Sequence, residues 1–146
     1  MVVRQERTGW RDQALSLRHR DWGLNCPAVD IDFLMLEYDH GLPVALVEYK
    51  HEDFDIGAMS DATWNAFRVL CENSKIPLYR VVYAKDLSWY EVEPMNDIAA
   101  AITAEIITLS EHDYVALLYR IRNRKMTGQL SREIHDRDQL RNQSGR

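Results

Sequence analysis

The chain has 146 residues, of which 46% are hydrophobic, and a formal net charge of −5 at pH 7. A chain of this length can bury a core of its own, so we expect one globular domain. No apolar run approaches the roughly 20 residues that cross a bilayer, and the first ten residues lack the apolar core of a signal peptide. We therefore predict a cytoplasmic protein without membrane contact, in which Cys26 and Cys71 are reduced.

The N-terminal part of the chain predicts a helix followed by a β-hairpin. The helix spans about residues 10–20, with Thr8 as its cap. Residues 33–38 (FLMLEY) and 44–49 (VALVEY) are rich in apolar and aromatic side chains and predict two strands. The segment between them, DHGLP, contains a glycine suited to a tight turn. Both faces of the hairpin are apolar along most of their length, so we expect both to be covered.

The middle of the chain predicts a second helix and a second hairpin. Ser60 precedes the segment DATWNAFRVLCEN, in which large apolar residues recur at helical spacing, so we expect a capped helix with a buried face. The next apolar runs, IPLYRVVYA and SWYEVEP, predict two strands joined by a turn at Lys85 and Asp86.

The C-terminal third of the chain predicts further helices. Asn96 caps a helix that extends through Ile106, and Ser110 opens another helix with an aspartate three residues later. Residues 127–146 are polar and poorly periodic, which indicates a weakly helical or disordered tail. The sequence therefore predicts a single α/β domain over residues 1–126, followed by this tail.

Charged residues gather at the open end of the first hairpin. If its turn centres near His40, Asp32 faces Glu48 across the antiparallel pair. Side chains two apart in a strand share a face. The face that results carries four charged residues: Asp30, Asp32, Glu48 and Lys50. Ionised groups beside a core need a partner or a metal ion, so this end of the hairpin is the predicted functional site.

The residue types at this end suit a hard divalent cation. Two carboxylates a few ångströms apart repel each other unless a cation lies between them. Mg²⁺ or Mn²⁺ binds one or two carboxylates together with water and substrate phosphate. Asp32 and Glu48 are the expected ligands, with the backbone carbonyl of Tyr49 as a further ligand and Asp30 in support. Lys50 would position the attacking water or stabilise the transition state, so the predicted chemistry is phosphodiester hydrolysis.

The letters D-I-D at residues 30–32 and E-Y-K at residues 48–50 resemble the PD-(D/E)xK nuclease superfamily. In that family a helix precedes a three-stranded meander, which a helix and a further strand follow. The first acid opens the second strand, and E-x-K lies on the third. The resemblance covers roughly residues 8–95. It implies an α/β restriction-endonuclease-like core, with a central mixed sheet of four to five strands flanked by helices and with additional C-terminal helices.

The aspartate that matches the family motif is Asp32 or Asp30, the glutamate is Glu48 and the lysine is Lys50. With Asp32 as the principal acid, the resemblance assigns catalysis to Asp32, Glu48 and Lys50. The proline of the family motif is displaced, because Pro27 precedes the first acid by several residues. Many members also carry an acid on the first helix, for which Glu6 and Asp12 are candidates. By size, the chain looks like the Holliday-junction resolvases and the phage-type nucleases of the family.

Basic residues gather at the two ends of the chain. Residues 1–22 carry five arginines against three acids, and residues 118–146 carry eight basic residues against three acids, so the segment between them has a net charge of −12. Basic side chains hold nucleic-acid phosphates. The C-terminal cations have a second explanation, because they also complement a helix dipole. The residues expected to contact nucleic acid are Arg18, His19, Arg20, Arg122, Arg124 and Lys125.

The sequence favours a Mg²⁺- or Mn²⁺-dependent deoxyribonuclease that acts on duplex or branched DNA. A homodimer is expected from the resemblance alone. Two alternatives stay open. A non-catalytic module that binds nucleic acid or protein, from a phage or a mobile element, would retain the carboxylates without using them. An enzyme acting on RNA would use the same residue types. The sequence contains no recognisable RNA-binding motif that would distinguish RNA from DNA as the substrate.

Overall fold

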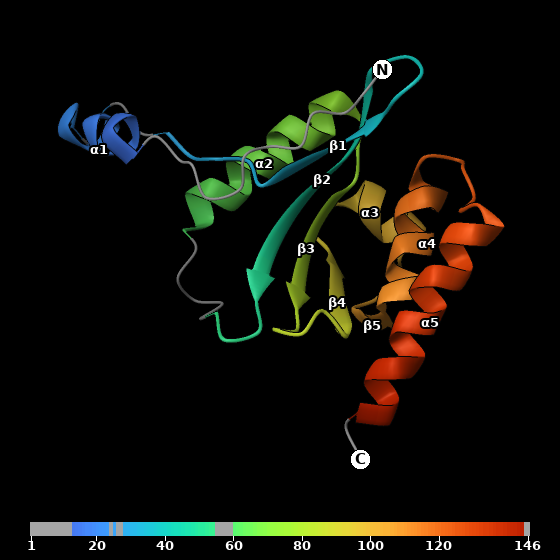
Figure 1. Cartoon of the computed structure of the whole chain (residues 1–146). Coiled ribbons are helices and arrows are strands. Elements are labelled where there is room, and N and C mark those ends of the chain that lie inside the picture. Colours follow the sequence, from blue (N-terminus) through green and yellow to red (C-terminus); the bar gives the residue numbers. More distant parts are fainter. Residues whose placement is uncertain (1–12, 24, 26–27, 55–59, 145–146) are drawn as a thin grey trace. The chain divides into compact units, whose positions relative to one another are not determined.

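A mixed sheet of five strands forms the centre of the structure (Figure 1). The computed structural model describes residues 13–23, 25, 28–54 and 60–144. Strands β2 and β3 are parallel, and the other neighbouring pairs are antiparallel. The predicted α/β class with a mixed sheet is therefore confirmed. The strands, in their order across the sheet, are β1 (Phe33–Glu37), β2 (Leu42–His51), β3 (Leu78–Tyr83), β4 (Trp89–Pro94) and β5 (Ile107–Ser110).

The chain divides into two units, Met1–Asp30 and Ile31–Arg146, and each is described by itself. The first unit contains α1 (Gln13–Asp21), where the sequence predicted a helix. The predicted cap of that helix and Cys26 lie outside the described residues. The second unit contains the sheet and the remaining described helices. The strands that position the candidate site belong to this unit.

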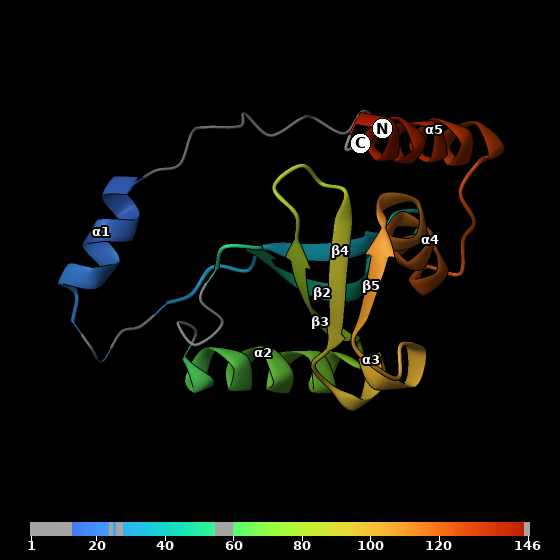
Figure 2. The same ribbon diagram turned by 90° about the horizontal axis from the view of Figure 1, so that it is seen from below.

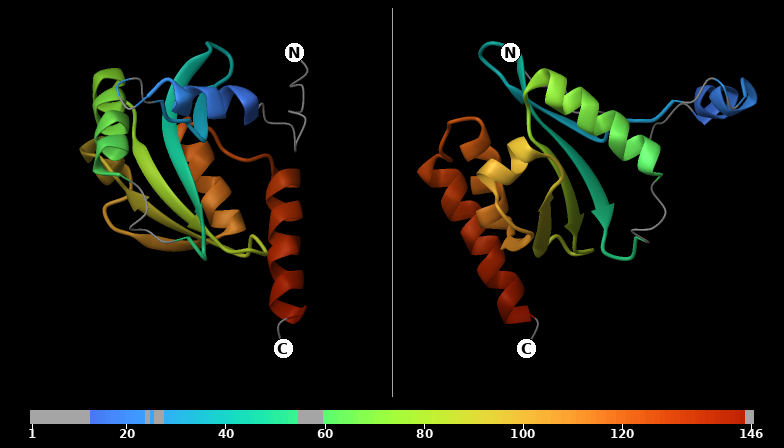
Figure 3. Two further views of the ribbon diagram at one scale, coloured as in Figure 1. Left: turned by 90° about the vertical axis from the view of Figure 1, so that its left-hand side faces the viewer. Right: turned by 180° about the vertical axis from the view of Figure 1, so that it is seen from behind.

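Helices lie on both faces of the sheet. α2 (Asp61–Ser74) covers one face and α4 (Glu111–Ile121) covers the other (Figure 2). α3 (Asp97–Ile102) follows β4, and α5 (Gly128–Ser144) runs beside α4 (Figure 3). No described helix combines the length and the apolar character that a bilayer crossing requires.

The core has two layers, one on each side of β2. Leu46 packs with α2 and its neighbour Val47 packs with α4, because successive side chains of a strand alternate between its faces. Burial raises the pKa of the Cys71 thiol to about 11, so this residue packs as an apolar group and is unreactive at neutral pH. The layer against α2 consists of Leu46, Trp64, Phe67, Cys71, Ile76 and Leu78. The layer against α4 consists of Val47, Tyr79, Val81, Val92, Ala99, Tyr114 and Leu117.

Polar residues cap three helices at the positions that the sequence predicted. The Ser60 hydroxyl accepts a hydrogen bond from the Thr63 N–H at the start of α2. The Ser110 hydroxyl accepts one from the Asp113 N–H at the start of α4. Asn96 begins α3 and is itself buried. Local capping signals therefore fixed the starts of three helices correctly.

The end of α2 is strained, because Lys75 adopts a left-handed conformation with a φ of 57°. A side chain makes this conformation unfavourable, whereas glycine adopts it freely. Replacing Lys75 by glycine should raise the free energy of unfolding by about 0.5–1 kcal/mol, measured by urea denaturation. The matched control is Lys75→Ala, which removes the same long side chain and keeps the strain. Equal stability of the two variants would contradict this explanation.

The strand β5 was not predicted. The sequence predicted a helix from Asn96 through Ile106, but α3 ends at Ile102 and the chain then enters β5. β5 pairs with β4, where Ile107 lies opposite Val92. Pairing with a neighbouring strand therefore overrode the local helical spacing on which the prediction was based.

The first hairpin is irregular near its turn. The pairing of β1 with β2 shifts between Met35 and Leu36, so Leu36 lies opposite Pro43. The prediction that both faces are covered is confirmed for the centre of β2, where Leu46 is fully buried, but is wrong for β1. Phe33 and Leu36 are each about half exposed, at 55% and 48%. β1 is the edge strand of the sheet, and edge strands have one neighbour only.

The segment 127–146 contains the 17-residue helix α5. The sequence predicted either a weak helix or a disordered tail here. Ile134 is its buried residue, at 2% exposure. Two ion pairs join α5 to the start of α4: Arg141 lies 2.8 Å and Arg137 lies 3.2 Å from the Glu111 carboxylate. The polar sequence of α5 is thus compatible with a packed helix because much of its attachment is ionic.

Candidate metal and phosphodiesterase site

The two predicted metal ligands flank the last residue pair at the open end of the β1–β2 hairpin. That pair is Phe33 and Val47, with Asp32 directly before β1 and Glu48 directly after Val47 in β2. Asp32 is exposed, whereas Glu48 is only 5% exposed. The pair therefore extends from the surface into the edge of the core.

The backbone of β2 holds Asp32 in place. Its Oδ2 accepts a hydrogen bond of 3.1 Å from the Tyr49 N–H, which uses one of the two carboxylate oxygens. The N–H and C=O groups of one strand residue point to the same side. The Leu46 N–H bonds to the Pro77 carbonyl next to β3, so odd-numbered residues such as Tyr49 point to the β1 side. The Tyr49 carbonyl therefore lies on the same side as Asp32, where it was predicted to be a ligand.

Glu48 has one paired and one unpaired carboxylate oxygen. Its Oε1 accepts a hydrogen bond of 2.6 Å from the Lys50 ammonium, and the two side chains are 7% and 14% exposed. Its Oε2 is buried and has no hydrogen-bond partner among the described residues. A buried carboxylate oxygen without a partner is unfavourable. Such an atom is expected where a ligand or an ion binds.

A charged row continues from this pair across the sheet. Glu48 lies beside Arg80 on β3, and Arg80 lies beside Glu93 on β4. The Arg80 guanidinium donates a hydrogen bond to Glu93 and lies over the Trp64 ring, 5.9 Å from its centroid. Its Nε is buried without a partner among the described residues. The row faces α2, and it places a second fixed cation beside Glu48.

Tyr49 contributes its backbone to the site and its side chain to the opposite face. Its hydroxyl is hydrogen-bonded to the Tyr114 hydroxyl, and its ring packs edge-on against Phe33, with 5.1 Å between centroids. Burial raises the pKa of Tyr49, and burial also raises the pKa of Tyr114. Both hydroxyls therefore stay protonated at neutral pH, so neither supplies a general base.

Two of the predicted phosphate-binding arginines lie at the other end of the hairpin. The Arg122 Nε donates a hydrogen bond of 2.9 Å to the Leu36 carbonyl, at the end of β1 that is remote from Asp32. Arg124 forms ion pairs with Glu37, at 3.3 Å, and with Asp39. Both guanidinium groups are thus engaged by the protein.

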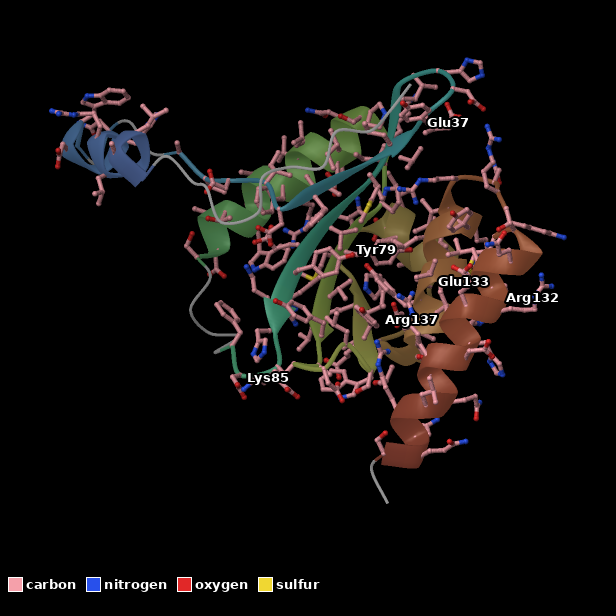
Figure 4. The ribbon with its side chains drawn as sticks, viewed as in Figure 1. Glu37, Tyr79, Lys85, Arg132, Glu133 and Arg137 are labelled. Carbon is pink, nitrogen blue, oxygen red and sulfur yellow. The ribbon has the colours of Figure 1, made fainter. Side chains whose placement is uncertain are left out.

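The remaining predicted cation of this region, Lys125, is exposed. With Arg120 and Arg124 it lines a surface cavity of about 520 Å³. Figure 4 marks two opposite ends of the sheet, with Glu37 near the turn of the first hairpin and Lys85 at the other end. The length of β1, on the order of 15 Å, separates these cations from the carboxylate pair. They would contact a different phosphate from the one at the carboxylates.

Four predicted site residues belong to the first unit and are described with it. Arg18, His19 and Arg20 lie in α1, where the His19 ring packs edge-on against Trp22 with 4.5 Å between centroids. Asp30 is the last residue of that unit. The candidates for a first-helix acid, Glu6 and Asp12, lie outside the described residues. The site within the second unit consists of Asp32, Glu48, Tyr49 and Lys50.

The donor set of this site fits a hard divalent cation that keeps much of its water. In the described part of the chain, no group of three or more His, Cys, Asp and Glu side chains is arranged to hold a metal ion. Mg²⁺ in phosphoryl-transfer sites often takes one or two carboxylates, with water and substrate phosphate as its other ligands. Asp32 and Glu48 match that smaller requirement, and the unpartnered Oε2 of Glu48 is an open ligand position.

Arg80 and Phe54 are site residues that the sequence reasoning missed. Arg80 is a charged residue inside the apolar strand LYRVVY. A charge beside a core needs a partner, and this signal points to Arg80 as it does to Glu48. Phe54 lies 5.0 Å from the Lys50 ammonium. No local signal distinguishes this aromatic residue from one that packs in the core.

Comparison with protein-family models, with curated proteins and with solved structures finds no match. The fold is an α/β domain with a five-stranded mixed sheet. The site combines two carboxylates, a strand carbonyl and a lysine at the open end of a hairpin.

Proposed function

We propose that the protein is a Mg²⁺- or Mn²⁺-dependent nuclease that hydrolyses DNA phosphodiester bonds on a restriction-endonuclease-like core of the PD-(D/E)xK type. Asp32 and Glu48 are the proposed metal ligands, the Tyr49 carbonyl is the third, and Asp30 assists. Lys50 is the proposed catalytic cation. One observation carries the proposal: Glu48 is buried, with one carboxylate oxygen on Lys50 and the other without a partner among the described residues.

The chemistry follows from the positions of these groups. A divalent cation held by the carboxylates would neutralise charge on the phosphate and lower the pKa of a bound water. Asp32 is oriented by the Tyr49 N–H, so its position is fixed before a ligand arrives. The Lys50 ammonium, once released from Glu48, can donate a hydrogen bond to the attacking water or to a phosphate oxygen. Lys50 thus pairs with Glu48 when no cation is bound and would act on the water or the phosphate when a cation is bound.

The proposed substrate is DNA, either duplex or branched. Arg122, Arg124 and Lys125 would hold phosphates away from the scissile bond, and Arg18, His19 and Arg20 are proposed for further backbone contacts. A homodimer is proposed because two-strand cleavage by one site per chain needs two copies. These parts of the proposal depend on the resemblance and on charge, and they are secondary to the carboxylate and lysine site.

The proposal is tested by cleavage assays on labelled linear duplex, single strand, flap and four-way junction DNA. Each substrate is incubated with Mg²⁺, with Mn²⁺ and with a chelator. Cutting that requires the divalent cation is the expected result, and the preferred substrate would define the subclass. A folded protein that cuts none of these DNAs, and no RNA of the same shapes, would refute the proposal.

Replacing Lys50 by methionine should abolish cutting and should tighten cation binding. The ammonium competes with the cation for the Glu48 carboxylate, so its removal leaves that carboxylate more available. We expect the Kd for Mn²⁺, measured by calorimetry, to fall several-fold, since two cations a few ångströms apart repel each other. Lys85→Met, at an exposed lysine in the β3–β4 loop, should change neither property. Weaker binding of Mn²⁺ by Lys50→Met would argue against competition for Glu48.

A second function is favoured by one observation. The Lys50 ammonium already neutralises Glu48, and a protein that never bound a metal would be stable with such a pair. A non-catalytic module that binds nucleic acid or protein is the alternative. It predicts DNA binding that is insensitive to divalent cations and to Lys50→Met, measured by fluorescence anisotropy with Mg²⁺ and with a chelator.

A further inference from the structure

The turn that follows β2 is fixed to the neighbouring strand. Glu52 makes one hydrogen bond to β3 and one to the β3–β4 loop: its N–H donates to the Tyr83 carbonyl at 3.0 Å, and its Oε1 accepts from the Lys85 N–H at 2.9 Å. The Phe54 N–H donates to the His51 carbonyl at 2.8 Å and closes the turn. These contacts give this polar segment a defined conformation and a defined place at the end of the sheet.

This turn brings an aromatic ring to the proposed catalytic lysine. The Lys50 ammonium lies 5.0 Å from the centroid of the Phe54 ring and 2.6 Å from the Glu48 carboxylate. A cation over an aromatic face is attracted by the ring quadrupole, and the attraction increases when water is excluded. The Lys50 side chain is 14% exposed, so the ammonium is largely shielded. Lysine is otherwise among the most flexible side chains.

The two contacts respond differently to a divalent cation. Glu48 is the carboxylate that the cation would take, so the cation and the ammonium compete for it. The Phe54 ring has no oxygen and does not bind Mg²⁺. If Glu48 bound a cation, the contact with the Phe54 ring would remain to hold the Lys50 ammonium at the site.

We infer that Phe54 is a positioning residue for Lys50, and that the His51–Phe54 turn exists to hold its ring over the ammonium. The inference rests on the proposed function for its effect on catalysis, although the placement of Lys50 is testable without it. Phe54 touches neither the substrate nor the cation. It acts by keeping Lys50 in the position from which it can donate a hydrogen bond.

The catalytic test compares Phe54→Leu with Phe54→Tyr. Leucine keeps the apolar bulk and removes the ring quadrupole, so we expect kcat to fall about tenfold at saturating Mg²⁺, with KM and the Mg²⁺ concentration at half-maximal rate nearly unchanged. Tyrosine keeps the ring and should restore kcat. Phe33→Leu is the matched control, because this ring lies against Tyr49 on the other face. An unchanged kcat in Phe54→Leu would overturn the inference while leaving the nuclease proposal standing.

The placement test does not need activity. The chain has four lysines, so protein labelled with ¹³C-lysine gives few side-chain signals, and Lys50→Arg identifies the signal of Lys50. The ε-methylene protons of Lys50 should resonate upfield of the others because of the ring current. They should move downfield in Phe54→Leu and stay in place in Phe54→Tyr and Phe33→Leu. An unchanged Lys50 chemical shift in Phe54→Leu would overturn the inference. This outcome can be read even if the wild type cuts no DNA and the nuclease proposal has failed.

Discussion

Glu48→Gln should lower Mg²⁺-dependent DNA cleavage by about a thousandfold or more. The amide keeps the size of the side chain but removes the negative charge that a cation needs, and metal assistance contributes several kcal/mol to such reactions. The rate is measured under single-turnover conditions with saturating Mg²⁺, and circular dichroism checks the fold. Glu72→Gln, at an exposed position of α2, is the control and should cut at the wild-type rate.

The same substitution has a cost in stability that can be separated from catalysis. Removing the charge of Glu48 leaves the largely shielded Lys50 ammonium without its anion, and breaking such a pair from one side is destabilising. The double variant Glu48→Gln, Lys50→Met has no unpaired charge left and should unfold at higher urea concentration than Glu48→Gln. It should remain inactive. Recovery of cutting in the double variant would mean that Glu48 acts through stability alone.

Asn96→Ala should lower the free energy of unfolding by about 3 kcal/mol, a large part of the stability of an ordinary domain. The Asn96 side chain is 7% exposed and makes three hydrogen bonds to backbone groups. Its Oδ1 accepts from the Leu78 N–H at 3.0 Å and from the Ala99 N–H at 2.9 Å. Its Nδ2 donates to the Ile76 carbonyl at 3.0 Å. Alanine would leave all three groups buried without partners.

Urea denaturation measures this loss, and two variants control it. Asn65→Ala, at an exposed position of α2, should leave stability unchanged or raise it slightly, because alanine favours a helix. Asn96→Asp keeps both accepted bonds and loses the donated one, so its stability should lie between wild type and Asn96→Ala. Similar losses for Asn96→Ala and Asn65→Ala would show that Asn96 does not tie β3 to α3.

The elements with local signals could be predicted from the sequence. Ser60, Asn96 and Ser110 each began a helix where a polar cap precedes apolar residues at helical spacing. Phe33 pairs with Val47 in the register that a turn centred near His40 predicts, although the pairing shifts between Met35 and Leu36. These features depend on residues close together in the chain, so the local sequence is enough to predict them.

The features that were missed depend on distant residues. The segment after α3 is a strand because β4 offers it a partner, and the helical spacing up to Ile106 gave no sign of that. The polar helix α5 is held by ion pairs with Glu111, 26 and 30 residues away along the chain. At the site, the neighbours of Glu48 and Lys50 are Arg80 on β3 and Phe54 on the turn after β2. Sequence spacing alone could not place them there.

The bulge between Met35 and Leu36 separates the two ends of the first hairpin. Inside a regular ladder, one added residue would turn every following side chain to the opposite face. A bulge absorbs such a change locally, so residues near the turn can be gained or lost while Phe33 stays opposite Val47. The turn is therefore the part of this hairpin where evolution can vary length without disturbing chemistry.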